Sequence, residues 1–162
     1  MNKKRTVFIT KAALIAALYV ALTGVSAMLT LDKGAIQVRL SEALTVLPIF
    51  TPAAIPGLFI GCALSSFLFG GLPLDVIFGS VATLIGAVGT YYIGKISKYL
   101  APIPPIVSNV IIIPLLLKYA YNLDGGIPYF ALTVLIGEFI CCGVLGTLLI
   151  RSMPKALTEQ LK

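Results

Sequence analysis

The sequence predicts an all-α fold, a bundle of six transmembrane helices that forms a single membrane domain over residues 1–162. Two observations support this prediction. Hydrophobic residues make up 59% of the chain and charged residues only 11%, whereas soluble domains are about half apolar and a quarter charged. The mean hydropathy is +1.04, and the apolar residues fall into runs that approach the roughly 20 residues that a membrane-spanning helix needs.

Turn signals divide the apolar runs into six predicted helices. Gly70 and Gly71 end the third helix, and the prolines of "KYLAPIPP" separate the fourth from the fifth because proline lacks a backbone N–H. The stretch "NLDGG" is a turn before the sixth. The second helix is too short to cross a membrane alone. The predicted ranges are 7–31, 41–50, 53–69, 74–96, 106–121 and 127–150.

The charged residues indicate how these helices are oriented. With a cytoplasmic N-terminus, Lys and Arg concentrate at the inner helix ends, as the positive-inside rule requires. Six crossings return the C-terminus to the same side, so we expect a multi-pass protein of the cell membrane with both termini in the cytoplasm. The inner cations are Lys3, Lys4, Arg5, Lys95, Lys98, Arg151, Lys155 and Lys162, and the outer ones are Lys33, Arg39 and Lys118.

The sequence argues against several functional classes. The net charge of +6 does not indicate nucleic-acid binding, because no basic stripe with interleaved aromatic residues is present. Histidine is absent and the three cysteines, Cys62, Cys141 and Cys142, lie in apolar runs, so we predict packing cysteines and no disulfide, metal site or cofactor. The stretch "GTYYIGK" fits the start of a phosphate-binding loop, but Ile96 follows it and it ends a transmembrane helix. We therefore expect no ATP site and no enzyme activity in this chain.

Glu138 is the most informative single residue. It lies about eleven residues below the outer end of the last helix, or ~16 Å at 1.5 Å per residue, near the middle of the membrane. Asn109 lies about twelve residues below the outer end of the preceding helix, or ~18 Å. An acid at this depth costs about 2.5–3.5 kcal/mol on insertion scales, so we interpret the pair as a binding site that faces a wet pocket. A Glu–Asn hydrogen bond that only joins two helices is the alternative.

Three more charged residues lie near the outer helix ends. Arg39 and Glu42 share a face at the start of the short helix, where the alternative is an exposed ion pair worth under ~1 kcal/mol. Asp75 starts the fourth helix, where the helix dipole alone accounts for an acid. Together, Glu42, Asp75 and Glu138 predict an acidic cavity that opens outward and suits a ligand with several N–H donors or a positive charge. Arg39 would bind an acceptor on the same ligand or close the site.

The first helix carries a ridge of small residues, Ala13, Ala17 and Ala21. In lipid, small side chains allow helices to approach closely, so the ridge suits either an external partner or packing inside the protein. The third helix repeats the spacing, and there we expect internal packing. The further small residues are Ala12 and Ala16, which widen the ridge, and Gly57, Gly61 and Ser65 in the third helix.

Four stretches of the sequence carry a family resemblance. The long "RLSEALTVLPIFTPAAIPGLFIG" is the most specific, and "GGLPLDVIFGSVATLIGA", "LAPIPPIVSN" and "IGEF" extend the likeness over about residues 10–149. They resemble the queuosine-precursor transporter family, the QueT-type substrate-binding (S) components of energy-coupling-factor (ECF) transporters. The resemblance implies the six-helix S-component fold and the role of S component in an ECF-type ABC importer. It also implies a membrane T component and two ATPases as partners, with the alanine ridge as docking face.

The substrate implied by the resemblance is a queuosine precursor, a 7-deazaguanine such as the aminomethyl or cyano form, or queuine. A guanine-like edge offers a ring N–H and an amino group to a carboxylate, and a carbonyl to an amide or Arg donor. Such a ligand requires that Glu138 face a pocket with room for a purine. The expected roles are Glu138 as acceptor of the donors, Asn109 beside it on the same edge, Glu42 or Asp75 for an aminomethyl cation, and Tyr121 or Phe78 stacked on the ring.

The implied mechanism is capture from outside, with the loop 32–39 as a lid, followed by toppling of the loaded protein when the partners hydrolyse ATP. Two other interpretations stay open. A stand-alone proton-coupled carrier or channel, acting as a homo-oligomer, would use Glu138 as its proton site. An assembly subunit would use its polar residues for helix packing alone. Transport by this chain alone in liposomes would favour the carrier.

Overall fold

The computed structural model describes residues 3–31, 38–69 and 71–154, and every regular element in these ranges is helical. The predicted all-α class is therefore confirmed. Of the predicted lid, only Val38 and Arg39 belong to the described residues, and the predicted cations Lys33, Lys155 and Lys162 lie outside them. The elements are α1 (Lys3–Met28), η1 (Leu40–Ile49), α2 (Ala54–Leu68), α3 (Pro73–Ile93), η2 (Lys98–Leu100), α4 (Ile103–Tyr119), α5 (Ile127–Glu138), η3 (Phe139–Leu145) and α6 (Gly146–Ser152).

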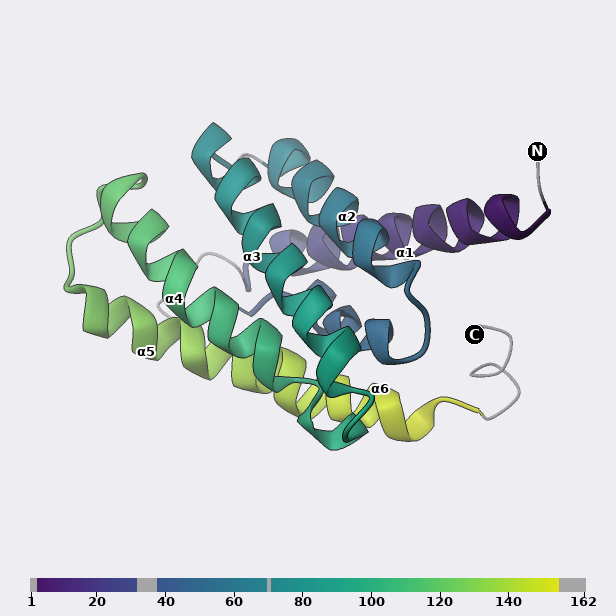
Figure 1. Cartoon of the computed structure of the whole chain (residues 1–162). Helices are drawn as coiled ribbons and strands as arrows, with labels where there is room; N and C mark the ends of the chain where they lie inside the picture. Colours follow the sequence, from purple (N-terminus) through teal and green to yellow (C-terminus); the bar gives the residue numbers. More distant parts are fainter. Residues whose placement is uncertain (1–2, 32–37, 70, 155–162) are drawn as a thin grey trace.

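The helices alternate in direction along the chain, and α3 is steeply inclined to α1 and to the stretch from α5 to α6 (Figure 1). α1 begins and α6 ends at the same end of the bundle, which we call the terminal end, and the turns from α2 to α3 and from α4 to α5 lie at the opposite, far end. The protein is a multi-pass membrane protein, because four helical stretches are long and apolar enough to cross a membrane. These are Lys3–Met28, Pro73–Ile93, Lys98–Tyr119 and Ile127–Ser152.

The short second helix, predicted over residues 41–50, is the 3-10 helix η1 and lies inside the bundle. It packs against α1, α2, α3, η3 and α6, and seven of its ten residues are buried. At ~2 Å per residue a ten-residue 3-10 helix spans only ~20 Å, so η1 does not cross the membrane by itself. In a 3-10 helix residues three apart lie above one another, which places Glu42 and Thr45 on one side of η1.

The other helix boundaries differ from the predicted ones by a few residues. α4 begins at Ile103, three residues before the predicted start, because Pro104 and Pro105 occupy its first turn, where the missing N–H groups have no helical partner anyway. α3 ends at Ile93, three residues earlier than predicted. The predicted sixth helix contains a π-helical segment, η3, between α5 and α6. Nothing in the sequence analysis indicated this segment.

α1 and α2 pack closely because small residues line their interface. A Cβ atom built on Gly61 would lie 2.8 Å from the Cβ of Tyr19, and one built on Gly57 would lie 2.7 Å from the carbonyl oxygen of Ala12. Both distances are too short for a side chain, so the internal packing predicted for these glycines is confirmed. Ala12 and Ala16, predicted to widen the ridge, are buried beside this interface and also line the groove along it.

Candidate functional site

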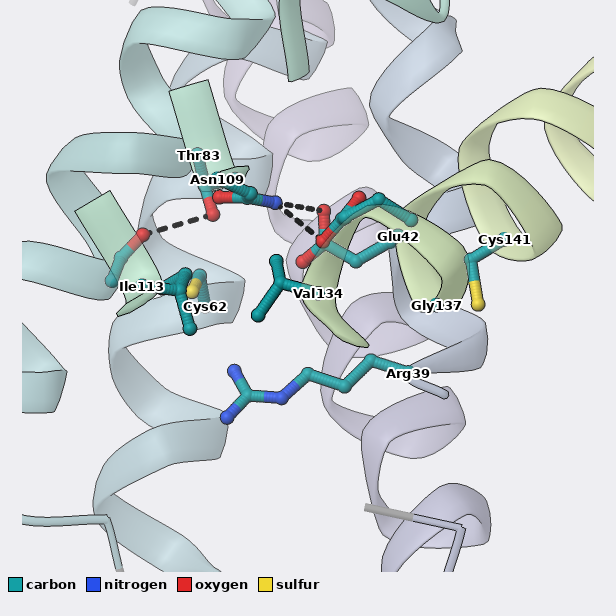
Figure 2. Close-up of a pocket in the computed structure, with 11 residues that line it drawn as sticks. Arg39, Glu42, Cys62, Thr83, Asn109, Ile113, Val134, Gly137 and Cys141 are labelled. Carbon is teal, nitrogen blue, oxygen red and sulfur yellow. Dashed lines mark hydrogen bonds between the residues drawn. The ribbon is translucent and has the colours of Figure 1, made fainter. Parts of the chain in front are cut away.

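A small polar cavity lies between η1, α2, α3, α4, α5 and η3 (Figure 2). The cavity proper has a volume of about 30 Å³, which is enough for a water molecule and well below the roughly 300–1,000 Å³ of small-molecule pockets. Counted out to solvent, the free space between its lining atoms is about 460 Å³. The lining residues are Arg39, Glu42, Cys62, Gly79, Thr83, Asn109, Ile113, Val134, Gly137, Glu138 and Cys141.

The amide of Asn109 connects the two acids of this cavity. Its Nδ2 donates to Oε1 of Glu138 at 2.7 Å and lies 3.5 Å from Oε2 of Glu42, at the limit of a hydrogen bond. Glu42 belongs to η1, Asn109 to α4 and Glu138 to the last turn of α5, so three elements meet here. The prediction that Asn109 and Glu138 reach one depth on neighbouring helices is confirmed.

Each acid has a second donor on its other oxygen. The Tyr19 hydroxyl of α1 donates to Oε1 of Glu42, and the Cys142 thiol donates to Oε2 of Glu138 at 3.0 Å. Tyr19 and Cys142 are 1% and 0% exposed, so water does not compete for these contacts. A buried carboxyl group without hydrogen-bond partners is costly, and these two donors together with Asn109 satisfy both acids.

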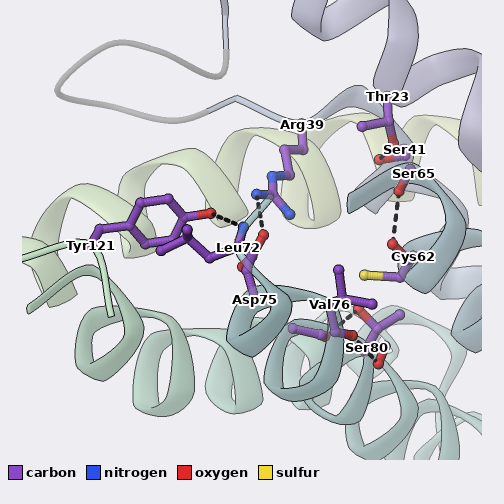
Figure 3. A network of polar contacts seen from close by, with 12 residues as sticks. Thr23, Arg39, Ser41, Cys62, Ser65, Leu72, Asp75, Val76, Ser80 and Tyr121 are labelled. Atoms are coloured by element: carbon purple, nitrogen blue, oxygen red, sulfur yellow. Dashed lines mark hydrogen bonds and ion pairs between the residues drawn. The ribbon is translucent and has the colours of Figure 1, made fainter. Parts of the chain in front are cut away.

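Arg39 pairs with Asp75 at the far end of the bundle (Figure 3). Its Nη2 lies 3.8 Å from Oδ2 of Asp75, which is buried in the first turn of α3. Arg39 precedes η1 with extended backbone angles, φ −102° and ψ 103°. Its side chain therefore leaves the chain in a different direction from that of Glu42, and the two do not share a helix face as predicted. In Figure 2 the Arg39 guanidinium lies on the opposite side of the cavity from Glu42 and Asn109.

The structure brings some predicted ligand residues to the cavity and leaves others away from it. Asp75 does not line the cavity but pairs with Arg39, which does. The Tyr121 hydroxyl accepts a hydrogen bond from the Leu72 N–H at 3.3 Å, and Phe78 is 49% exposed in an apolar groove between α3 and α4. Neither aromatic ring lines the cavity, and their predicted stacking on a ligand stays a prediction. The predicted residues that do line it are Arg39, Glu42, Asn109 and Glu138.

Tyr19 and Cys142 are the two hydrogen-bond donors to the acids that the sequence analysis missed. The buried positions of α1 recur every three or four residues, and Tyr19 lies on that inward stripe, so its hydroxyl was detectable as a polar group facing the core. Cys142 follows Glu138 by four residues, the spacing of neighbours on one helix face. It was interpreted as a packing residue, but its hydrogen bond to Glu138 gives it a polar role as well.

The same cluster also has the spacing of a metal-ligand set. Glu42, Glu138 and Cys142 each place one ligand atom within 4.8 Å of the others. Their oxygens and sulfur already exchange hydrogen bonds with Tyr19 and Asn109 and with each other. This arrangement is accounted for without an ion, and the predicted lack of a metal site stays a prediction.

The alanine ridge of α1 faces out of the protein. Ala13, Ala17 and Ala21 are exposed and line a groove of about 700 Å³ between α1 and α2, whose other walls include Phe8 and Ile60. Of the two alternatives for the ridge, packing inside the protein is therefore excluded for these three residues. The groove leaves room for a partner helix.

A multi-pass helical bundle that gathers two acids and an amide around a central cavity has the architecture of a membrane transporter, where such groups mark a solute path. The chain belongs to the QueT transporter family, because the family's model matches residues 9–155. It is also similar to the Queuosine precursor transporter QueT of Lactococcus lactis subsp. cremoris (strain MG1363), with 39% identity over 85 residues. This match covers 52% of the chain and spans about half, 50%, of the length of that curated relative. No solved structure matches the chain.

Proposed function

We propose that this protein is the S component of an ECF-type ABC importer, which captures a queuosine precursor outside the cell and delivers it to the cytoplasm. The observation that carries the proposal is the convergence of Glu42, Asn109 and Glu138 on one cavity from three separate elements. Family membership and the name of the relative support it. The S-component fold, the cell membrane and the cytoplasmic position of both termini belong to the same proposal.

The chemistry of the cavity supports a 7-deazaguanine as the ligand. A guanine-like edge offers N–H donors to carboxylates and a carbonyl to an amide or guanidinium. Glu42 and Glu138 supply the acceptors, and Asn109 and Arg39 supply the donors. Among the described residues, two acids and one cation line the cavity. This excess of acids also favours an aminomethyl cation on the ligand.

Ligand entry requires the cavity to widen, because about 30 Å³ does not hold a purine. Arg39 is the lining residue best placed to move. It lies at the far end, its side chain is 28% exposed, and its ion pair with Asp75 is long, at 3.8 Å. Withdrawal of the guanidinium joins the cavity to the outer part of the roughly 460 Å³ of free space between the lining atoms.

The proposed partners are a membrane T component and two ATPases. The groove along Ala13, Ala17 and Ala21 is the proposed docking face, since small side chains allow a foreign helix to approach closely. The first five residues of "GTYYIGK" complete helix α3 and so do not form the loop of a phosphate site.

The test is a titration of the purified protein in detergent with 7-cyano- and 7-aminomethyl-7-deazaguanine, guanine and riboflavin, with the melting temperature as readout. A ligand that binds only the folded state raises its stability by mass action, by about 2.7 kcal/mol at a hundredfold excess over Kd. We expect a rise in melting temperature with a 7-deazaguanine and none with riboflavin. No rise with either 7-deazaguanine, or a rise with riboflavin alone, would refute the proposed function.

A further inference from the structure

The hydrogen bonds around Glu42 and Glu138 divide their four carboxylate oxygens into two kinds. Oε1 of Glu42 and Oε2 of Glu138 face into the protein and accept from Tyr19 and Cys142. Oε2 of Glu42 and Oε1 of Glu138 both face Nδ2 of Asn109, at 3.5 and 2.7 Å. Each acid therefore has one oxygen held by the protein and one that faces the cavity.

The two inward donors are fixed by packing. Tyr19 belongs to the main hydrophobic core, and the close approach of Gly61 to its Cβ leaves the side chain no room to withdraw. Cys142 is fully buried, and its sulfur also lies 3.3 Å from Oγ1 of Thr45 and from the carbonyl oxygen of Glu42. Its single proton serves one acceptor at a time, and Oε2 of Glu138, at 3.0 Å, is the nearest.

The group that Asn109 places between the two acids is a planar NH₂. A planar amide NH₂ has two hydrogens in the plane of the group, and the two cavity-facing oxygens lie around this one nitrogen. The exocyclic amino group of a guanine-like ring is the same kind of donor. A ligand can thus take over both acceptors with one group if the Asn109 side chain turns aside.

We infer that the ligand's exocyclic amino group replaces the Asn109 NH₂ between Oε2 of Glu42 and Oε1 of Glu138, and that Tyr19 and Cys142 are positioning residues that keep these oxygens in place. This inference rests on the proposed function. It makes the amino group the main determinant of specificity, because a ligand without it has no donor to replace the Asn109 NH₂ at these two acceptors, and sites built for a polar group reject analogues that lack it.

The experiment measures Kd by calorimetry on the purified full chain for 7-deazaguanine and for 7-deazahypoxanthine, which differs only by the absent amino group. We expect the wild type to prefer 7-deazaguanine by at least about thirtyfold. Tyr19→Phe and Cys142→Ala each remove one inward donor and should lower this preference about threefold to tenfold. Cys142→Ser restores an O–H donor and should bring the preference back.

The control is Thr90→Val, which removes a fully buried hydroxyl that donates to the Ala101 carbonyl oxygen, away from the cavity. It should lower stability without changing the preference. A wild type that binds both compounds equally would overturn the inference and leave the proposed function standing. An unchanged preference in Cys142→Ala would likewise overturn the inference and leave the proposed function standing. This result suffices even if Tyr19→Phe does not fold. A wild type that binds neither compound would overturn this inference, and one that also fails to bind 7-cyano- and 7-aminomethyl-7-deazaguanine would refute the proposed function as well.

Discussion

At the scale of single residues, the charge on Glu138 is expected to serve ligand binding at a cost to stability. Glu138→Gln keeps an acceptor for the Asn109 amide but removes the negative charge. Hydrogen bonds to charged groups are worth about 1.5–3 kcal/mol, so we expect the affinity for a 7-deazaguanine to fall about tenfold to hundredfold. The melting temperature should stay level or rise, because a neutral amide is less costly to bury than a carboxylate. Calorimetry and thermal unfolding measure the two effects.

Asp124→Asn is the matched control for this prediction. It makes the same chemical change in an exposed turn between α4 and α5, so both affinity and stability should stay at the wild-type level. If Glu138→Gln raised stability and left ligand affinity unchanged, Glu138 would be a helix-packing residue, as the assembly-subunit interpretation holds.

The Arg39–Asp75 pair makes a second prediction at this scale. The Arg39 side chain is 28% exposed and the two charged atoms are 3.8 Å apart, so solvent screens the attraction and we expect a coupling energy of about 1 kcal/mol. A double-mutant cycle with Arg39→Gln, Asp75→Asn and both together, read by chemical unfolding in detergent, measures it. If the stability changes of the two single variants simply add in the double variant, the Arg39–Asp75 pair does not hold the far end closed.

At the scale of helices, the contact between α1 and α2 fixes the position of Tyr19 and so reaches the site. Gly61→Ala places a Cβ 2.8 Å from the Tyr19 Cβ and 3.1 Å from the Ala16 backbone. Overpacking of this kind costs about 1–3 kcal/mol, so we expect a lower free energy of unfolding. Gly126→Ala is the control, because its Cβ would meet nothing closer than 3.6 Å. Equal stability of the two variants would show that α1 and α2 separate freely.

The same scale shows what the sequence could and could not predict. Runs of apolar residues between turn signals were sufficient to place every long helix, and counting residues from the helix ends was sufficient to bring Asn109 and Glu138 to one depth. The 3-10 geometry of η1 and the π segment after Glu138 depend on the surrounding helices, which no local pattern reveals. These two segments orient Glu42 and Cys142, so the sequence could indicate the inward position of Tyr19 and the spacing of Cys142 from Glu138 but not their hydrogen bonds to the two acids.

At the scale of the whole molecule, α1 links the two proposed binding surfaces. One face of α1 carries Ala13, Ala17 and Ala21 in the exposed groove, and the opposite face carries Tyr19, whose hydroxyl contacts Glu42. A partner helix that moves α1 would therefore move a donor of the ligand site directly. This arrangement offers a short physical route by which docking of the partners could lower ligand affinity, since coupling requires a contact that differs between two states.

Reconstitution in liposomes tests this larger assembly and separates it from the stand-alone carrier. The chain alone should bind a radiolabelled 7-deazaguanine without accumulating it, and accumulation should require the T component, both ATPases and ATP. Ala17→Leu fills the groove with a bulky side chain at an exposed position, so it should leave ligand affinity near the wild-type value and abolish both co-purification with the partners and transport. Val144→Leu adds bulk at an exposed position of η3, outside the groove, and should change neither co-purification nor transport. Uptake driven by a proton gradient in liposomes that hold this chain alone would instead make Glu138 a proton-carrying site, and the alanine groove would then have to join copies of the carrier.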